Sequence, residues 1–253
     1  MEGTVFWLAA LVAAVFVGLG KGGVPVITAL AVPVLALVIS PVAAAGLLLP
    51  VFIVSDVFGL IAYRKLFDWP VLRIMMVAMP PGVLIGYLTV NIVSEGLITL
   101  LLGLIGAVFA LSLMLRRPAD GPPRKPRWRP GLFWGTITGF TSFVSHSGAV
   151  PYQVFTLPLR MPKIAFVGTV TVAFAYINVI KLIPYYLLGQ LSVANLKTAG
   201  ILMIPAAVAV LAGVRLVRIV PEKLFFRLVI WALLLLSLKL IWDGLQQMWL
   251  QVP

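Results

Sequence analysis

The stretch GLGKGGVP at residues 18–25 interrupts an apolar run near the start of the chain, and SHSGAVP at 145–151 interrupts another about half a chain later. Both stretches combine glycine, proline and polar side chains with hydrophobic flanks. In a bilayer every backbone N–H and C=O needs a partner, so non-helical backbone persists only where protein or a water-filled cavity surrounds it. Two such breaks in corresponding places of two halves are typical of the binding site of a transporter.

The composition indicates a membrane protein. The chain has 253 residues, of which 62% are hydrophobic and 10% charged, and a mean hydropathy of +1.14. Soluble domains carry roughly 25% charged residues. The apolar runs approach the ~20 residues that a helix needs to cross a bilayer, and they are continuous rather than alternating. We therefore expect an all-α polytopic fold. Glu2 is the only charged residue before the first run, which therefore lacks the basic start of a signal peptide. This run is expected to belong to the mature fold.

The net charge is +12, and the basic residues fall mainly in short segments between the apolar runs. This distribution indicates membrane topology rather than a surface for nucleic acid. The sequence contains no cysteine, which removes disulfides and thiolate sites. We expect no metal site and no cofactor.

Apolar runs and breaker residues divide the chain into a first membrane repeat, 1–115, and a second, 131–253, joined by a basic linker, 116–130. Each half is predicted to begin with a broken or re-entrant helix pair and to continue with three transmembrane helices. The pairs are expected at 4–19 with 22–39 and at 131–144 with 148–159; the long segments are expected at 42–63, 71–90, 96–115, 163–188, 195–217 and 222–245. Pieces as short as the second pair favour re-entry, and full crossing is left open.

Glycines and prolines recur in the same order in the two halves, which indicates an internal repeat. The matches run at offsets of 121 to 127 residues and are Gly22 to Pro25 with Gly148 to Pro151, Pro41 with Pro162, Pro81 with Pro205, and Gly86 with Gly213. Three full crossings in each half place the second repeat upside down relative to the first. This is the inverted-repeat design of many secondary transporters.

The basic residues predict the orientation. With this topology, 15 of the 19 Lys and Arg residues gather on one side. Cytoplasmic loops are rich in Lys and Arg, so that side and the linker 116–130 are expected in the cytoplasm. Both termini then lie outside an inner membrane.

Four ionisable side chains are expected at membrane depth: Lys21, Asp56, His146 and Lys181. Such a residue costs roughly 2.5–3.5 kcal/mol on insertion scales and is by default a functional-site hypothesis. Asp56 matches Asn178 at an offset of 122 residues, and Asn178 shares a helix face with Lys181. We expect the two breaks and these two helices to meet near the midplane.

This set predicts a site for a small anion, because two lysines outweigh one aspartate and helix starts near the breaks add free N–H groups. Asp56 and His146 are the candidates for proton coupling. Other readings stay open: Asp56 as an ion-pair partner of Lys181 or Lys21, a snorkelling Lys181, a loop position for Lys21, and capping roles for the second break. The substrate-binding candidates are Lys21, Gly22, Gly23, Ser145, His146, Ser147, Gly148, Asn178 and Lys181.

The pattern G-x-G-x-G-G-x-P at 18–25, its degraded repeat at 145–151, FVGT at 166–169 and NVIKLIPY at 178–185 resemble the sulfite exporter TauE/SafE family, also called the toluene sulfonate uptake permease family. The resemblance extends from about Phe6 to Leu245. It implies a permease for sulfur-containing anions, such as sulfite, sulfonates or thiosulfate. Lys21 stands where family members often carry a small residue, and Ser145-His146-Ser147 replaces a second glycine run, so the particular anion is left open.

Other functions are distinguishable by experiment. A secondary transporter, with export favoured, is the main hypothesis; an anion channel is its variant. A non-transporting membrane subunit or scaffold is an alternative, but the short loops leave little docking surface outside 116–130. Self-association of the protein is left open. A hydrolase using Ser145 or Ser147 with His146 would need a third group to orient the base, and the chain has no other histidine. We therefore expect the protein not to be an enzyme.

Overall fold

The computed structural model describes residues 3–39, 41–90, 92–115, 124–189 and 193–250, and within these ranges its regular structure is entirely helical. The expectation of an all-α fold is confirmed. The elements are α1 (Thr4–Lys21), α2 (Pro25–Thr28), α3 (Ala31–Ala36), α4 (Pro41–Tyr63), α5 (Trp69–Thr89), α6 (Glu95–Leu115), α7 (Trp128–Val144), α8 (Ala149–Thr156), η1 (Leu157–Leu159), α9 (Lys163–Leu187), α10 (Val193–Ile219) and α11 (Glu222–Leu250).

Seven helices in the described part of the chain are long and apolar enough to cross a membrane: α1, α4, α5, α6, α9, α10 and α11. The chain is therefore a multi-pass membrane protein. Helix α7 has 17 residues, or about 26 Å at 1.5 Å per residue, and is not among them. It begins three residues earlier than expected, so residues 128–130 of the predicted linker are helical, whereas 116–123 lie outside the described residues.

The first break differs from the expectation of one helical piece at 22–39. Helix α2 begins only at Pro25 and has four residues, and α3 follows as a separate helix of six. Pro25 suits a helix start because its missing N–H is not needed there. Pro33 within α3 also lacks an N–H, which weakens a continuous helix through this segment. The second break follows the expectation, with α8 beginning directly after Gly148.

The helices form two compact units that each combine both halves of the sequence. The first unit contains 1–68 and 164–221, and the second contains 69–163 and 222–253. Compactness therefore does not follow the predicted division at 116–130. The repeat boundaries, which concern sequence rather than packing, stay a prediction.

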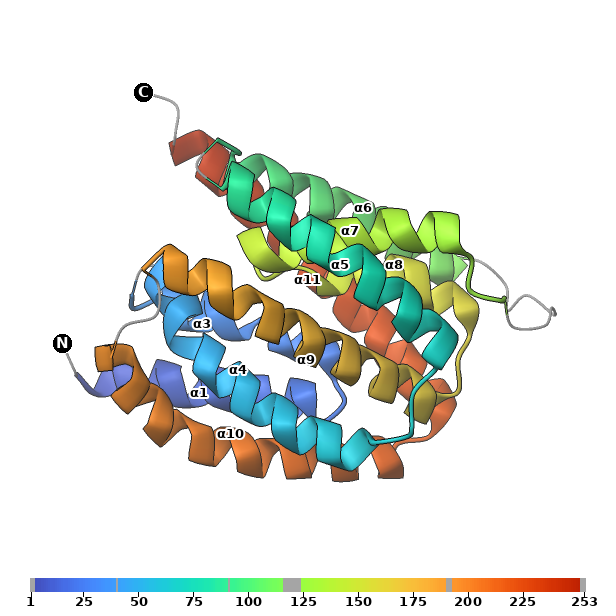
Figure 1. The fold of residues 1–253 in the computed structure, drawn as a ribbon, viewed down its shortest axis with the longest axis horizontal. Helices are drawn as coiled ribbons and strands as arrows, with labels where there is room; N and C mark the ends of the chain where they lie inside the picture. Colours follow the sequence, from blue (N-terminus) through green and yellow to red (C-terminus); the bar gives the residue numbers. More distant parts are fainter. Residues whose placement is uncertain (1–2, 40, 91, 116–123, 190–192, 251–253) are drawn as a thin grey trace. The chain divides into compact units, whose positions relative to one another are not determined.

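In the first unit α1 packs along α10, and α10 also packs on α4 (Figure 1). Small residues permit the close approach: a Cβ on Gly18 would lie 2.2 Å from the Ala206 carbonyl oxygen, and one on Gly22 would lie 2.4 Å from that of Val210. Small residues at crossings are typical of membrane helices, which associate through close packing. The buried core around this crossing includes Ala10, Ala13, Ala14, Val17, Leu47, Leu48, Val51, Leu202 and Ala206.

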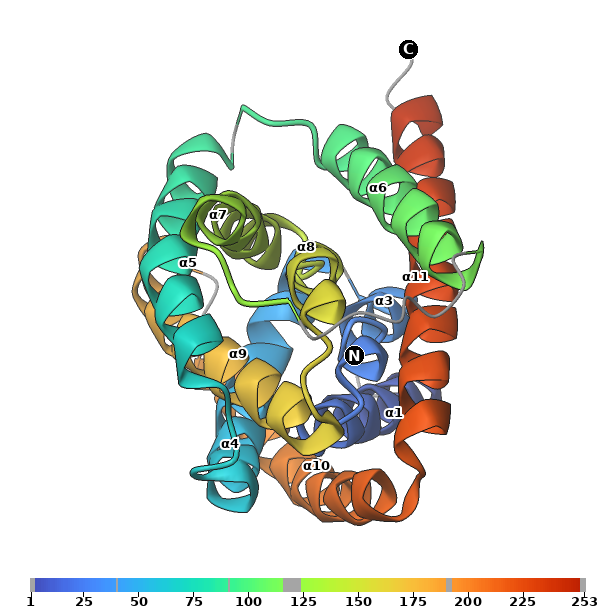
Figure 2. The same ribbon diagram turned by 90° about the vertical axis from the view of Figure 1, so that its right-hand side faces the viewer.

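In the second unit α5 packs along α7, and α6 packs along α11 (Figure 2). A Cβ on Gly139 would lie 2.1 Å from the Met79 carbonyl oxygen, and one on Gly82 would lie 2.0 Å from that of Thr136. Under the predicted repeat, α7 corresponds to α1 and α5 to α10. Helix α1 of the first half packs on α10 of the second half. In the corresponding way, α7 of the second half packs on α5 of the first half.

Candidate functional site

Lys21 is the last residue of α1 and is only 5% exposed. Its Nζ lies 2.6 Å from Oδ1 of Asp56 on α4, in an ion pair that lacks the alignment of a hydrogen bond. The ammonium group also lies over two aromatic rings, 5.5 Å from the centroid of Phe52 and 6.0 Å from that of Phe174. Rings at this range attract a cation through their π faces. Lys21 is therefore part of the packed interior of the first unit, and the reading of it as a loop residue is wrong.

Asn178 on α9 donates a hydrogen bond of 2.7 Å from Nδ2 to Oδ2 of Asp56. The carboxylate is thus engaged at both oxygens, by a lysine and by an amide. Asp56 and Asn178 are also the positions that the repeat matches to each other. Matched positions touch where an internal two-fold axis passes, so this contact is the one that a two-fold arrangement would produce.

Lys181 is 1% exposed and lies three residues after Asn178 on α9. The spacing of Thr171, Phe174, Asn178 and Lys181 puts the four on one helix face. Lys21 and Lys181 carry two formal positive charges, and Asp56 carries one negative charge. The buried cluster of Lys21, Asp56, Asn178 and Lys181, which we call the lysine cluster, therefore has a formal net charge of +1.

The glycines of the first break shape the end of α1. Gly23 has φ +131°, which a side chain would strain, and the N–H of Val24 reaches back to the carbonyl of Leu19 at 3.2 Å. The carbonyl oxygen of Gly22 accepts a hydrogen bond of 2.5 Å from the Tyr63 hydroxyl. Gly22 and Gly23 thus hold the turn that ends at the lysine cluster; their contact with substrate stays a prediction. The role of Tyr63 was not predicted from the sequence, because its hydrogen-bond partner is a backbone atom 41 residues away.

We expect Tyr63→Phe to lower the stability of the protein by about 1 kcal/mol, the usual net contribution of such a hydrogen bond. For a chain of this length that corresponds to a fall of about 2–4 °C in Tm. Thermal unfolding in detergent measures it. Tyr186→Phe is the matched control, because Tyr186 lies on α9 of the same unit and is exposed; an equal fall in both variants would contradict the role given to Tyr63.

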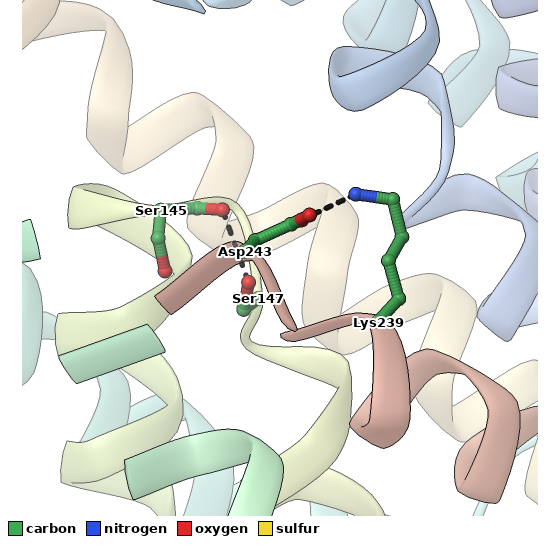
Figure 3. A network of polar contacts seen from close by, with 4 residues as sticks. All are labelled: Ser145, Ser147, Lys239 and Asp243. Atoms are coloured by element: carbon green, nitrogen blue, oxygen red, sulfur yellow. Dashed lines mark hydrogen bonds and ion pairs between the residues drawn. The ribbon is translucent and has the colours of Figure 1, made fainter. Parts of the chain in front are cut away.

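The second break, in the second unit, is closed by its own polar groups. His146 has φ +54°, and the N–H groups of Ser145 and Ser147 both donate to the Thr141 carbonyl, at 3.1 and 3.2 Å. The Ser145 hydroxyl donates to the same carbonyl at 3.3 Å. The Ser147 hydroxyl donates to the Ser145 carbonyl at 3.1 Å (Figure 3). Both hydroxyls thus serve the end of α7. Gly148 caps α8 without a side-chain bond.

The left-handed backbone of His146 makes a separate prediction. Asn adopts this conformation readily, whereas a β-branched residue does not. We expect His146→Val to be less stable than His146→Asn by about 1–3 kcal/mol, because only the valine variant strains the backbone here. Thermal unfolding of the two variants side by side checks the expectation, which fails if Val is tolerated as well as Asn.

Two further polar features of the second unit were not foreseen. Lys239 and Asp243 form an ion pair at i,i+4 on α11 (Figure 3). The spacing of these opposite charges on a helix could have predicted the pair from the sequence. The Gln153 amide on α8 is 1% exposed, and neither its oxygen nor its nitrogen has a hydrogen-bond partner. No sequence pattern marks an unpartnered amide.

Among the described residues no group of His, Asp and Glu could hold a metal ion. The first unit instead offers buried donors and an excess of positive charge, inside a helical protein with several membrane-spanning segments. The fold is that of a polytopic membrane protein, and a charged interior in such a protein is typical of a transporter.

A family model for the sulfite exporter TauE/SafE matches residues 5–240, nearly the whole chain, and the protein belongs to that family. The family is one of transporters, not enzymes. Comparisons with curated proteins and with solved structures gave no significant match.

Proposed function

We propose that the protein carries a small sulfur-containing oxyanion, sulfite or an organosulfonate, across the inner membrane, and that Lys21 and Lys181 bind it. The observation that carries the proposal is the composition of the buried lysine cluster, in which two lysines and one carboxylate give a formal net charge of +1. A net charge at membrane depth is costly, and a bound monoanion would neutralise the formal charge of the cluster. Membership of a sulfite exporter family supports the sulfur chemistry.

Export is the direction that membrane physics favours. An inside-negative potential of 100 mV drives one negative charge outward with about 2.3 kcal/mol. Export therefore needs no coupling ion for a monoanion. The ion pair of Asp56 with Lys21 gives this carboxylate a structural role, and a proton-coupling role for Asp56 or His146 remains part of the proposal only for uptake against the potential.

Flux of sulfite by the purified protein in liposomes tests the proposal. We expect saturable flux that increases when substrate is present on the far side and that follows an imposed potential. Flux that does not saturate would indicate a channel, and no flux by the protein alone would favour a subunit or scaffold. Accessibility of residues near both termini to an impermeant label tests the predicted exterior location of the ends.

A further inference from the structure

In the described part of the first unit, two buried hydroxyls have no hydrogen-bond partner: Ser55 Oγ on α4 and Thr171 Oγ1 on α9, in residues that are 1% and 3% exposed. Several hydroxyls elsewhere on the described helices donate to the carbonyl four residues earlier. Examples are Thr138, Thr141, Thr156, Thr169 and Ser237, at 2.6–2.8 Å. This local bond is available to any helical Ser or Thr. Ser55 and Thr171 depart from it.

Ser55 and Thr171 both neighbour residues of the lysine cluster. Gly59 is one turn after Ser55 on α4, and a Cβ there would lie 2.8 Å from Thr171 Cγ2 and 3.1 Å from the backbone oxygen of Lys21. Thr171 and Lys21 therefore both pack against the same residue of α4. Ser55 precedes Asp56 in the chain and shares a helix face with Gly59.

The charge of this region indicates which ligand the hydroxyls meet. A hydroxyl can donate to an anion or offer its oxygen to a cation. Asp56 is already paired with Lys21, and the lysine cluster has a formal excess of positive charge, which repels a cation. An oxyanion held by the lysines presents several oxygens, each able to accept a hydrogen bond. A hydroxyl that has no hydrogen-bond partner within the protein can donate to one of them.

We propose that the hydroxyls of Ser55 and Thr171 donate hydrogen bonds to the transported oxyanion and complete the site formed by Lys21 and Lys181. The inference rests on the proposed function, since it adds ligands to the same site. It extends that function in one respect: the site recognises oxygen atoms by neutral donors in addition to charge. A spherical halide would gain less from these donors than an anion with several oxygens.

The test compares Thr171→Val, which keeps the shape of the side chain, and Ser55→Ala with the wild type. Sulfite affinity is measured by titration calorimetry in detergent. We expect each variant to weaken Kd about 10- to 100-fold, as for loss of a hydrogen bond to a charged group. The Tm of the ligand-free protein should stay equal or rise, because the lost hydroxyl had no partner there. Thr171→Ser, which keeps a hydroxyl, should bind nearly as the wild type does.

Thr169→Val is the matched control on the same helix. The Thr169 hydroxyl accepts from the N–H of Asp68 at 2.8 Å and donates to the Ala165 carbonyl. Its loss should lower the Tm and leave the affinity unchanged, which is the opposite of the effect expected at Thr171.

Separate outcomes overturn separate claims. Affinity that survives both Thr171→Val and Ser55→Ala overturns this inference and leaves the proposed function standing. A wild type that binds neither sulfite nor a sulfonate overturns the proposed function; carboxylate and phosphate are then titrated, and the hydroxyl variants must weaken whichever oxyanion binds. Titrations with sodium replaced by N-methylglucamine form the last arm. If the hydroxyl variants change only the dependence of sulfite affinity on sodium, the hydroxyls bind a cation, contrary to the inference.

Discussion

Lys181→Met is expected to weaken the binding of sulfite at least 100-fold and to abolish flux in liposomes. Methionine fills a similar volume without charge, so the substitution removes one of two positive charges and leaves the Lys21–Asp56 pair, which is neutral. The remaining cluster then offers an anion hydrogen-bond donors but no net charge. The fold should persist, because a buried lysine that is 1% exposed is replaced by an apolar side chain of similar size.

Lys197→Met is the matched control for this prediction. Lys197 lies on α10 of the same unit and its side chain is exposed. Affinity and Tm should both remain at the wild-type values. Titration calorimetry gives the affinity, and thermal unfolding gives the Tm. Full affinity in Lys181→Met, with Tm retained, would exclude Lys181 as an anion ligand.

Breaking the Lys21–Asp56 pair is expected to have the largest effect on stability. Lys21→Met leaves the Asp56 carboxylate buried without its cation, and Asp56→Asn leaves the ammonium without its anion. Removing one partner of a buried ion pair costs about 3–5 kcal/mol. Replacing both partners at once removes both charges, so the double variant Lys21→Met/Asp56→Asn should regain most of the lost stability. Asn at position 56 can still accept the hydrogen bond from Asn178.

A double-mutant cycle measures this coupling as the free energy of unfolding of the four proteins in mixed micelles. The double variant should fold and yet bind sulfite poorly, because it lacks Lys21. This separates the two roles of Lys21: its stabilising role is replaceable, and its charge for the anion is not. Additive losses in the two single variants would show that the pair is not coupled.

The sequence foresaw part of the site, and for identifiable reasons. The repeat matches Asp56 with Asn178, and charge at membrane depth indicates Lys21, Asp56 and Lys181. In the structure, Lys21 and Asn178 both contact the Asp56 carboxylate. Ser55 and Tyr63 were not foreseen. The importance of Tyr63 lies in a bond to a distant backbone oxygen, and that of Ser55 in the lack of any bond, and neither leaves a pattern in the chain.

The first break shows what local sequence does not predict. Glycine and proline predicted an interruption after Lys21, which is confirmed, but the piece that follows is two short helices rather than one. Hydrophobicity alone does not distinguish these forms, because an apolar segment supported by packing need not be one continuous helix.

By itself the sequence determined the membrane class, the helical content and the two breaks, because hydrocarbon imposes length, apolarity and backbone pairing on any chain that crosses it. Only the tertiary structure decided which partner Asp56 takes and that each compact unit combines both halves of the chain. Those choices depend on close fits between surfaces far apart in sequence, such as Gly18 against Ala206 and Gly59 against Thr171, and such fits exist only once the helices have packed.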